Sequence, residues 1–147
     1  MRRKLLFGIE ALVGGAAVAG GVLLTAAPDG HLLAADPAVL MGTPFADYLV
    51  PGILLALLVG GGGLVVAALT GRRARYARAC AVLYATGVVA FEGVEYSLIG
   101  WQPLQAVIGA LGLAMLLLAL TAPSALRTEV GLLNPVPVSR ETTRPSD

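Results

Sequence analysis

The sequence predicts an all-α membrane protein with four transmembrane helices packed in a compact bundle. Of its 147 residues, 57% are hydrophobic and only 13% are charged, and the mean hydropathy is +0.84. A soluble domain usually has roughly a quarter of its residues charged, so most of this surface must face lipid. Four apolar runs have the ~20 residues needed to cross ~30 Å of hydrocarbon. They are Leu5–Ala26, Pro51–Thr70, Tyr76–Leu98 and Leu104–Ala122.

The first of these runs also resembles a secretory signal, because a basic start precedes an apolar stretch. Glu10 interrupts that stretch and Pro28 would follow the cut, so an uncleaved first span is predicted. Residues 1–126 then form one transmembrane domain. Residues 127–147 are polar and rich in proline, which predicts a disordered cytoplasmic tail.

The basic residues predict how the chain is oriented in the membrane. All ten lie at the N-terminus, in the loop between the second and third runs, or in the tail after the fourth run. With four spans these places share one side, and the positive-inside rule makes both termini cytoplasmic. The other side has Asp29, Asp36 and Asp47 but no Lys or Arg. Nine of the ten basic residues are Arg, and Ala, Gly and Val abound, which favours a GC-rich bacterium and hence a multi-pass protein of the bacterial plasma membrane.

The first external loop, about residues 27–50, is too long for a simple hairpin. Asp36 precedes Pro37, and Thr43 precedes Pro44. A capping side chain followed by proline is typical of a helix start. The loop is therefore predicted to contain short helices at the membrane interface.

Small residues predict where the helices touch, since apolar side chains gain little by leaving lipid for one another. The glycine run at 60–63 has two interpretations: a broken helix that coordinates a ligand, or a site of close packing. No polar side chain lies within several residues of it, which favours packing. The predicted packing residues are Gly15, Ala19, Gly60, Gly61, Gly62, Gly63, Ala106 and Ala110. Such patterns are also typical of a homo-oligomer or a larger membrane complex.

The stretch "FEGVEYSLIGWQPLQ" places two carboxylates near the outer end of the third run. Glu92 and Glu95 are three residues apart and so share a helix face, roughly 9 to 13 Å inside the level of Trp101. No Lys or Arg lies on that side, and His31 is the only cation available there. The pair must therefore be hydrated, hold a proton, accept hydrogen bonds or bind an external cation.

The functional hypothesis is an outward-facing acidic pocket that binds a ligand or a cation. The alternative is a pair of hydrated carboxylates at the rim of the bundle. The candidate pocket residues are Glu92, Glu95, Asp47, Tyr48, Gln102 and Gln105. Glu10 lies near the other end of the first run, where Arg2, Arg3, Lys4 or the loop Arg72–Arg78 is expected to neutralise it.

Other chemistry has little support in the sequence. The single cysteine, Cys80, and the single histidine, His31, predict no disulfide and no metal site. No nucleophile–base pair or phosphate-binding loop is present, so no cofactor is predicted and an enzyme is disfavoured. The lipid bilayer is the expected partner, and nucleic acid is not.

Two segments, "TPFADYLVPGILL" and "EYSLIGWQPLQAVIGALGLAMLLLAL", resemble a group of small bacterial four-span integral membrane proteins of unassigned function. The resemblance covers about half of the chain. It implies the four-span topology and draws attention to Asp47, Pro51, Gly52, Glu95 and Gln102. It implies no reaction.

We therefore expect a non-catalytic membrane protein that binds a lipid or small ligand, or serves as an accessory or scaffold bundle. The alternative is a small transporter or channel for protons, cations or small solutes that uses Glu92 and Glu95. A transport path would need polar groups deeper in the third run, and only Tyr84 and Thr86 occur there.

Overall fold

The computed structural model describes residues 1–100 and 103–121, and these contain helices and no strand. The predicted tail, 127–147, lies outside the described residues, as do Trp101 and Gln102. The helices are α1 (Arg2–Ala26), α2 (Leu49–Leu54), the π-helix η3 (Leu55–Gly61), α3 (Gly62–Gly71), α4 (Ala77–Ile99) and α5 (Pro103–Thr121). Two short 3-10 helices, η1 (His31–Leu33) and η2 (Pro37–Leu40), lie between α1 and α2.

The length and composition of the helices fit a membrane protein. Three helical segments are long and apolar enough to cross a bilayer: Arg2–Ala26, Leu49–Gly71 and Ala77–Leu98. The apolar segment Gln105–Thr121 is shorter and matches the fourth predicted run. Large apolar side chains such as Leu12, Leu57 and Leu83 are exposed on the outside of the helices. The prediction of a helical chain with several apolar helices long enough to cross a membrane is confirmed for the described residues.

The second membrane-crossing segment stays helical through its glycine run. Gly61 has φ −60° and ψ −45°, and Gly62 has φ −56° and ψ −47°, which are ordinary helical values. The irregularity is a stretch of π-helix just before Gly62, in which the hydrogen bonds span one more residue than in an α-helix. The glycine run therefore does not break the helix.

Glycines let α1 lie directly against this second segment. A Cβ atom added at Gly60 would lie 2.7 Å from the backbone nitrogen of Val18. One added at Gly14 would lie 2.8 Å from the nitrogen of Leu64, and one at Gly63 would lie 2.9 Å from the Cα of Gly14. These distances are shorter than any real Cβ contact, so the two backbones approach closely only because side chains are missing. Gly21 and Gly52 form a similar contact farther along the pair.

The close contacts involve only part of the predicted set. Gly60 and Gly63 take part, whereas Cβ atoms at Gly61 and Gly62 would have only ordinary contacts at 3.7 and 3.6 Å. A Cβ at Gly15 would meet nothing within 4 Å. Ala19, Ala106 and Ala110 are exposed in the single chain. The buried stripe of α1 passes through residues 10, 14, 17 and 21 instead, because one step along the chain turns the helix by ~100°.

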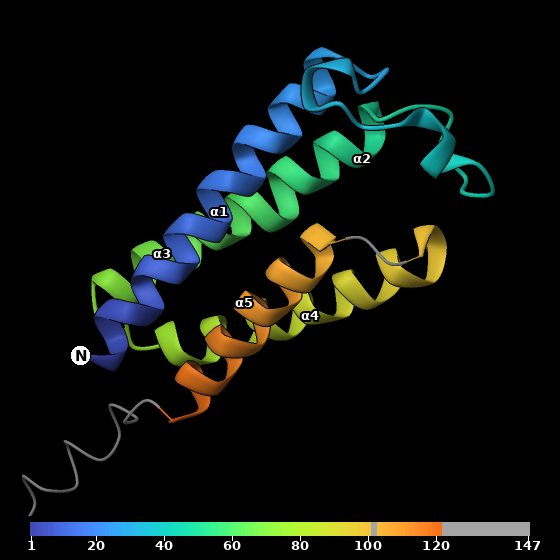
Figure 1. The fold of residues 1–147 in the computed structure, drawn as a ribbon. Coiled ribbons are helices and arrows are strands. Elements are labelled where there is room, and N and C mark those ends of the chain that lie inside the picture. Colours follow the sequence, from blue (N-terminus) through green and yellow to red (C-terminus); the bar gives the residue numbers. More distant parts are fainter. Residues whose placement is uncertain (101–102, 122–147) are drawn as a thin grey trace, which may run out of the picture.

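The helices form two hairpins that are joined at one end (Figure 1). The first hairpin pairs α1 with the α2–η3–α3 segment, and the second pairs α4 with α5. Contacts of α3 with α4 and of α1 with α5 connect them. We call the end with the N-terminus and the α3–α4 connection the basal end, and the opposite end, with residues 27–48, the loop end. Figure 1 shows the hairpins close together at the basal end and separated toward the loop end.

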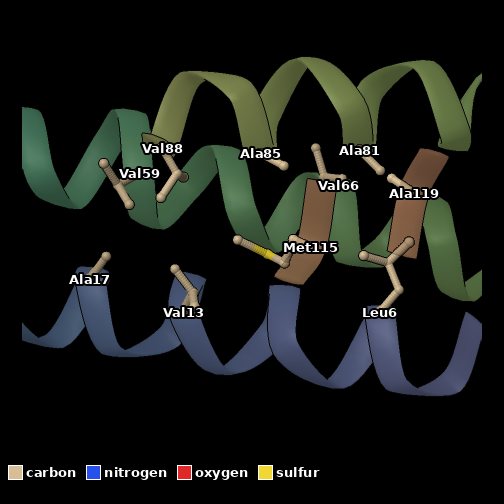
Figure 2. Packing of buried hydrophobic residues seen from close by; sticks show 10 residues of the cluster. All are labelled: Leu6, Val13, Ala17, Val59, Val66, Ala81, Ala85, Val88, Met115 and Ala119. Carbon is tan, nitrogen blue, oxygen red and sulfur yellow. The ribbon is translucent and has the colours of Figure 1, made fainter. Parts of the chain in front are cut away.

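The apolar core lies between the hairpins and follows the basal part of the bundle (Figure 2). Its buried residues are Leu6, Val13, Ala17, Val59, Val66, Ala81, Ala85, Val88, Met115 and Ala119. They come from α1, η3, α3, α4 and α5. The position of the core explains why the hairpins stay together at the basal end.

Local hydrogen bonds shape the long connection between α1 and α2. The Asp36 side chain accepts a bond of 2.8 Å from the Ala38 amide, and Pro37 opens η2, which confirms the predicted helix start. The Thr43 hydroxyl accepts a bond from the Phe45 amide, but no helix begins there. Asp29 lies 2.6 Å from the ring of His31, and the hydrogen bonds from His31 lower the pKa of Asp29.

The close contact at Gly60 leads to a first prediction. Gly60→Ala should destabilise the protein by ~1–3 kcal/mol, because the new methyl group overlaps the Val18 backbone. Gly61→Ala is the matched control, since it makes the same change in the same helix where a methyl group has room. The thermal unfolding midpoint in detergent measures both. Equal midpoints for the two variants would contradict the close helix contact.

Candidate functional site

Glu92 is a carboxylate on the inner face of α4. It continues the buried stripe formed by Ala81, Ala85 and Val88, and only 8% of its surface is exposed. Its Oε2 atom is buried and has no hydrogen-bond partner within the described chain. A buried carboxylate oxygen without a hydrogen-bond donor is costly, particularly at membrane depth. Glu92 is therefore the strongest site candidate among the predicted residues.

Glu92 lies where the packed core ends. Figure 2 shows Val59, Val88 and Ala17 at the same end of the core cluster. Glu92 is one helical turn beyond Val88, a rise of ~6 Å toward the loop end. A Cβ at Gly112 would lie 3.1 Å from the Val88 side chain, so α5 packs tightly against α4 just below this level. The Glu92 carboxylate thus lies at the end of the apolar core, where the two hairpins separate.

The structure keeps the two predicted glutamates together. Glu95 is partly exposed, and its charge lies within electrostatic range of Glu92. Gln105 is half-buried near the start of α5, the helix paired with α4. Gln102 lies outside the described residues. The α4–α5 hairpin therefore carries three of the six predicted pocket residues within the described part.

Asp47 and Tyr48 belong to the other hairpin, directly before α2. Asp47 is exposed, and its side chain accepts a hydrogen bond of 2.9 Å from the Leu49 amide. The Tyr48 hydroxyl donates a bond of 2.7 Å to the Asp36 carbonyl. Burial, and to a smaller extent the charge of Asp36, raise the pKa of Tyr48. These hydrogen bonds shape the connection between α1 and α2 and do not reach α4.

A second buried acid, Glu10, lies in the basal half of the bundle. Its exposure is 0%, and neither carboxylate oxygen has a hydrogen-bond partner among the residues described. The buried Thr70 hydroxyl lies beside it without a hydrogen bond of regular geometry. The expected neutralisation by a basic residue is wrong: Arg3 points to the Thr70 carbonyl at 3.5 Å, and within the described chain no basic group pairs with Glu10.

Tyr84 completes this group of polar side chains. Its hydroxyl donates a hydrogen bond of 2.8 Å to the Val59 carbonyl, and its oxygen would lie 2.5 Å from a Cβ at Gly63. Glu10 lies within electrostatic range of the hydroxyl. We call Glu10, Thr70 and Tyr84 the basal polar cluster. One feature of the sequence could have indicated that Glu10 is buried. Glu10 is four residues from Gly14 and so shares the buried face of α1.

Two pockets lie beside α1. The basal pocket has a volume of about 200 Å³ and is lined by Arg3, Lys4, Phe7, Thr70 and Gly71. The other has about 370 Å³ and lies in the loop-end half, where Val22, Thr25, Ala26, Ile53, Ala56 and Leu57 make it almost entirely apolar. Only the basal pocket touches a member of the basal polar cluster.

Metal binding has no support from the described residues, which contain no group of three or more His, Cys, Asp or Glu able to hold an ion. Comparison with known proteins adds no assignment: no protein-family model matches the chain, and no curated protein and no solved structure matches it. The resemblance to small four-span bacterial proteins therefore stays a prediction.

The hydrogen bond of Tyr84 leads to a second prediction. Tyr84→Phe should lower the stability by ~0.5–1.5 kcal/mol, because it removes the donor to the Val59 carbonyl. Tyr96→Phe is the matched control on the same helix, since Tyr96 is 58% exposed. Thermal unfolding in detergent compares the two. A loss of stability as large in the control as in Tyr84→Phe would show that the bond does not stabilise the bundle.

Proposed function

We propose that the chain is a non-catalytic protein of the bacterial plasma membrane that binds an amphipathic ligand between the outward-facing ends of its two hairpins. Glu92 is the polar anchor of this site, and Glu95 adds negative charge beside it. The ligand is a lipid or lipid-like molecule whose head group donates hydrogen bonds. The resemblance to four-span bacterial membrane proteins is consistent with this proposal but adds no ligand.

The charge distribution supports cytoplasmic termini. Arg2, Arg3 and Lys4 lie at the basal end, as does the Arg-rich connection 72–76 (Figure 1). The loop end carries Asp29, among other acids, and no Lys or Arg among residues 27–48. Positive charge marks the cytoplasmic side of membrane proteins. The loop end, toward which Glu92 lies, then faces outward.

The observation that carries the proposal is the unpartnered Oε2 atom of Glu92, in a side chain only 8% exposed. Leaving a buried polar atom without a partner costs ~1–3 kcal/mol, and more when the group is charged. A ligand that donates a hydrogen bond removes this cost. Ionisable groups within membrane spans mark functional sites by default.

The position of Glu92 fits a lipid head group or the glycerol region just beneath it. The end of α4, Ile99, is seven positions farther along the helix, a rise of ~10 Å. The polar layer on each face of a bilayer is ~5–8 Å thick, and the glutamate side chain can extend toward it. The hairpins also separate at this level, so the ligand's chains can stay in the surrounding lipid.

The transport alternative is less well supported. Val13, Ala17, Val59 and Val88 form an apolar part of the core between Glu92 and the basal end. Glu10 lies farther along α1 toward the basal end than Val13 and Ala17, and the Tyr84 hydroxyl is engaged in its hydrogen bond to the Val59 carbonyl. Transport of a cation past Glu92 would require this part of the core to open. Ligand binding at Glu92 requires no such change.

Native mass spectrometry with two lipids of identical acyl chains tests the proposal. Phosphatidylethanolamine has N–H donors in its head group, and phosphatidylcholine has none. The wild-type protein should bind the former several-fold more tightly, and Glu92→Gln should lose most of this preference because the amide carries no charge. Glu95→Gln is the matched comparison and should lose less, since Glu95 is partly exposed.

Two outcomes would contradict this function. One is equal binding of both lipids by the wild-type protein, since the site would then select no donor. The other is an equal loss in Glu92→Gln and Glu95→Gln. That result would mean that negative charge near the surface attracts the head group without a buried contact.

A separate prediction concerns orientation and uses a Cys80→Ala background. A cysteine replacing the exposed Ala38 should react with a membrane-impermeant maleimide in intact cells. A cysteine replacing Arg75 should react only after the membrane is permeabilised. The reverse pattern would place the loop end in the cytoplasm and overturn the outward-facing site.

A further inference from the structure

A ligand bound at Glu92 does not explain why buried polar groups also occur in the basal polar cluster. Glu10 is fully buried, and both of its oxygens lack a hydrogen-bond partner within residues 1–100 and 103–121. The Thr70 hydroxyl beside it is also buried and unpartnered. Orphaned buried polar atoms are rare in folded proteins. Three such atoms, both Glu10 carboxyl oxygens and the Thr70 hydroxyl oxygen, lie in the basal polar cluster. Their grouping indicates that the cluster takes up a proton, water or another species from outside the chain.

The groups around Glu10 favour the neutral acid over the anion. Tyr84 has one hydroxyl proton and donates it to the Val59 carbonyl, so it presents only an acceptor to Glu10. The neighbouring part of α5 contributes the apolar side chains of Met115 and Ala119. An anion would need several donors here, whereas a carboxylic acid has a proton of its own to donate.

The nearby positive charges oppose a metal cation. Arg3 and Lys4 line the basal pocket, and Arg3 binds the Thr70 carbonyl. A divalent metal ion held at Glu10 would keep a net positive charge beside both side chains, whereas a proton taken up by the Glu10 carboxylate only neutralises it. The same two residues form no ion pair with Glu10 within the described chain, so they do not hold it as an anion.

Thr70 connects the pocket with the acid. Thr70 is one of the residues that line the basal pocket, and its hydroxyl lies beside the Glu10 carboxyl. A threonine hydroxyl can accept one hydrogen bond while it donates another. A pocket of about 200 Å³ is large enough for several water molecules.

We propose that Glu10 is a proton-binding site that exchanges its proton with water in the basal pocket through the Thr70 hydroxyl. This site is independent of the ligand proposed at Glu92. With the proposed orientation the pocket faces the cytoplasm, so the proton comes from cytoplasmic water.

The transfer conserves protons and charge. Pocket water in its protonated form gives a proton to the Thr70 oxygen, while the Thr70 hydroxyl proton passes to an oxygen of the Glu10 carboxylate. The Glu10 side chain becomes a neutral acid, and the water returns to its neutral form. Rotation of the Thr70 hydroxyl then restores the starting arrangement. No further reactant is required.

Proton binding at this place has a structural consequence. Glu10 lies one turn from Gly14, where α1 and α3 are in backbone contact. An uncompensated charge there would draw water between the helices, because the single Thr70 hydroxyl is too little to satisfy a buried anion. The neutral acid lets the helices stay closely packed. The proton on Glu10 therefore holds α1 against α3.

Infrared spectroscopy of the protein in lipid bilayers tests the proposal, because a protonated carboxyl has its own C=O band. At neutral pH the wild-type protein should show this band, and Glu10→Gln should remove its Glu10 component. Glu92→Gln is the matched control and should leave that component in place. Transfer into D₂O shifts the band as the proton exchanges. Thr70→Val should slow the exchange several-fold without removing the band.

Two results would overturn the inference. A spectrum in which Glu10→Gln removes no protonated-carboxyl band would show that Glu10 holds no proton. An unchanged exchange rate in folded Thr70→Val would show that Thr70 is not the path. Labelling of the unmutated chain by the apolar reagent dicyclohexylcarbodiimide, which requires a protonated carboxyl, gives an independent check: failure to label Glu10 would also contradict the proposal. None of these measurements depends on lipid binding at Glu92.

Discussion

The close backbone contact between α1 and the second membrane-crossing segment is the constraint on which the rest of the structure depends. Inside a bilayer, apolar side chains gain little by leaving lipid, so helices associate through close packing and hydrogen bonds. Gly14, Gly60 and Gly63 provide this packing, because their missing side chains allow one backbone to touch the other. The contact sets the rotation of α1 about its own axis. It thereby decides which polar side chains face inward.

The rotation of each helix about its own axis explains the position of the buried acid that it carries. On α1, the face that presents Gly14 also presents Glu10 one turn earlier. On α4, the face that presents Ala85 and Val88 to the core also presents Glu92 one turn later. Glu10 lies within the packed half of the bundle, whereas Glu92 lies where the hairpins separate. One acid is therefore reached from the basal pocket, and the other from the loop end.

The sequence predicted the helices well and their rotations poorly, for a physical reason. The length and apolarity of each run were enough to find the membrane-crossing segments, and the pair of Asp36 and Pro37 was enough to find η2. A helix in lipid is apolar on all sides, however, so no contrast between faces shows which one is buried. Gly14 and Gly15 are neighbouring glycines in the same apolar run, yet only Gly14 forms the close contact with the second membrane-crossing segment. The assignment of Glu10 to charge balance failed for the same reason, because it required the acid to face the basic residues.

Stability alone does not account for either acid. Replacing a buried polar group by an apolar one of the same shape is often neutral or stabilising. A bundle held together by close packing would thus lose nothing if apolar side chains stood at both positions. The two acids are also separated by the apolar side chains of Val13, Ala17 and Val88, so one is not needed to satisfy the other. We therefore propose that each acid serves what reaches it from its own end of the bundle: a proton through Thr70 at Glu10, and a hydrogen-bond donor of a lipid-like ligand at Glu92.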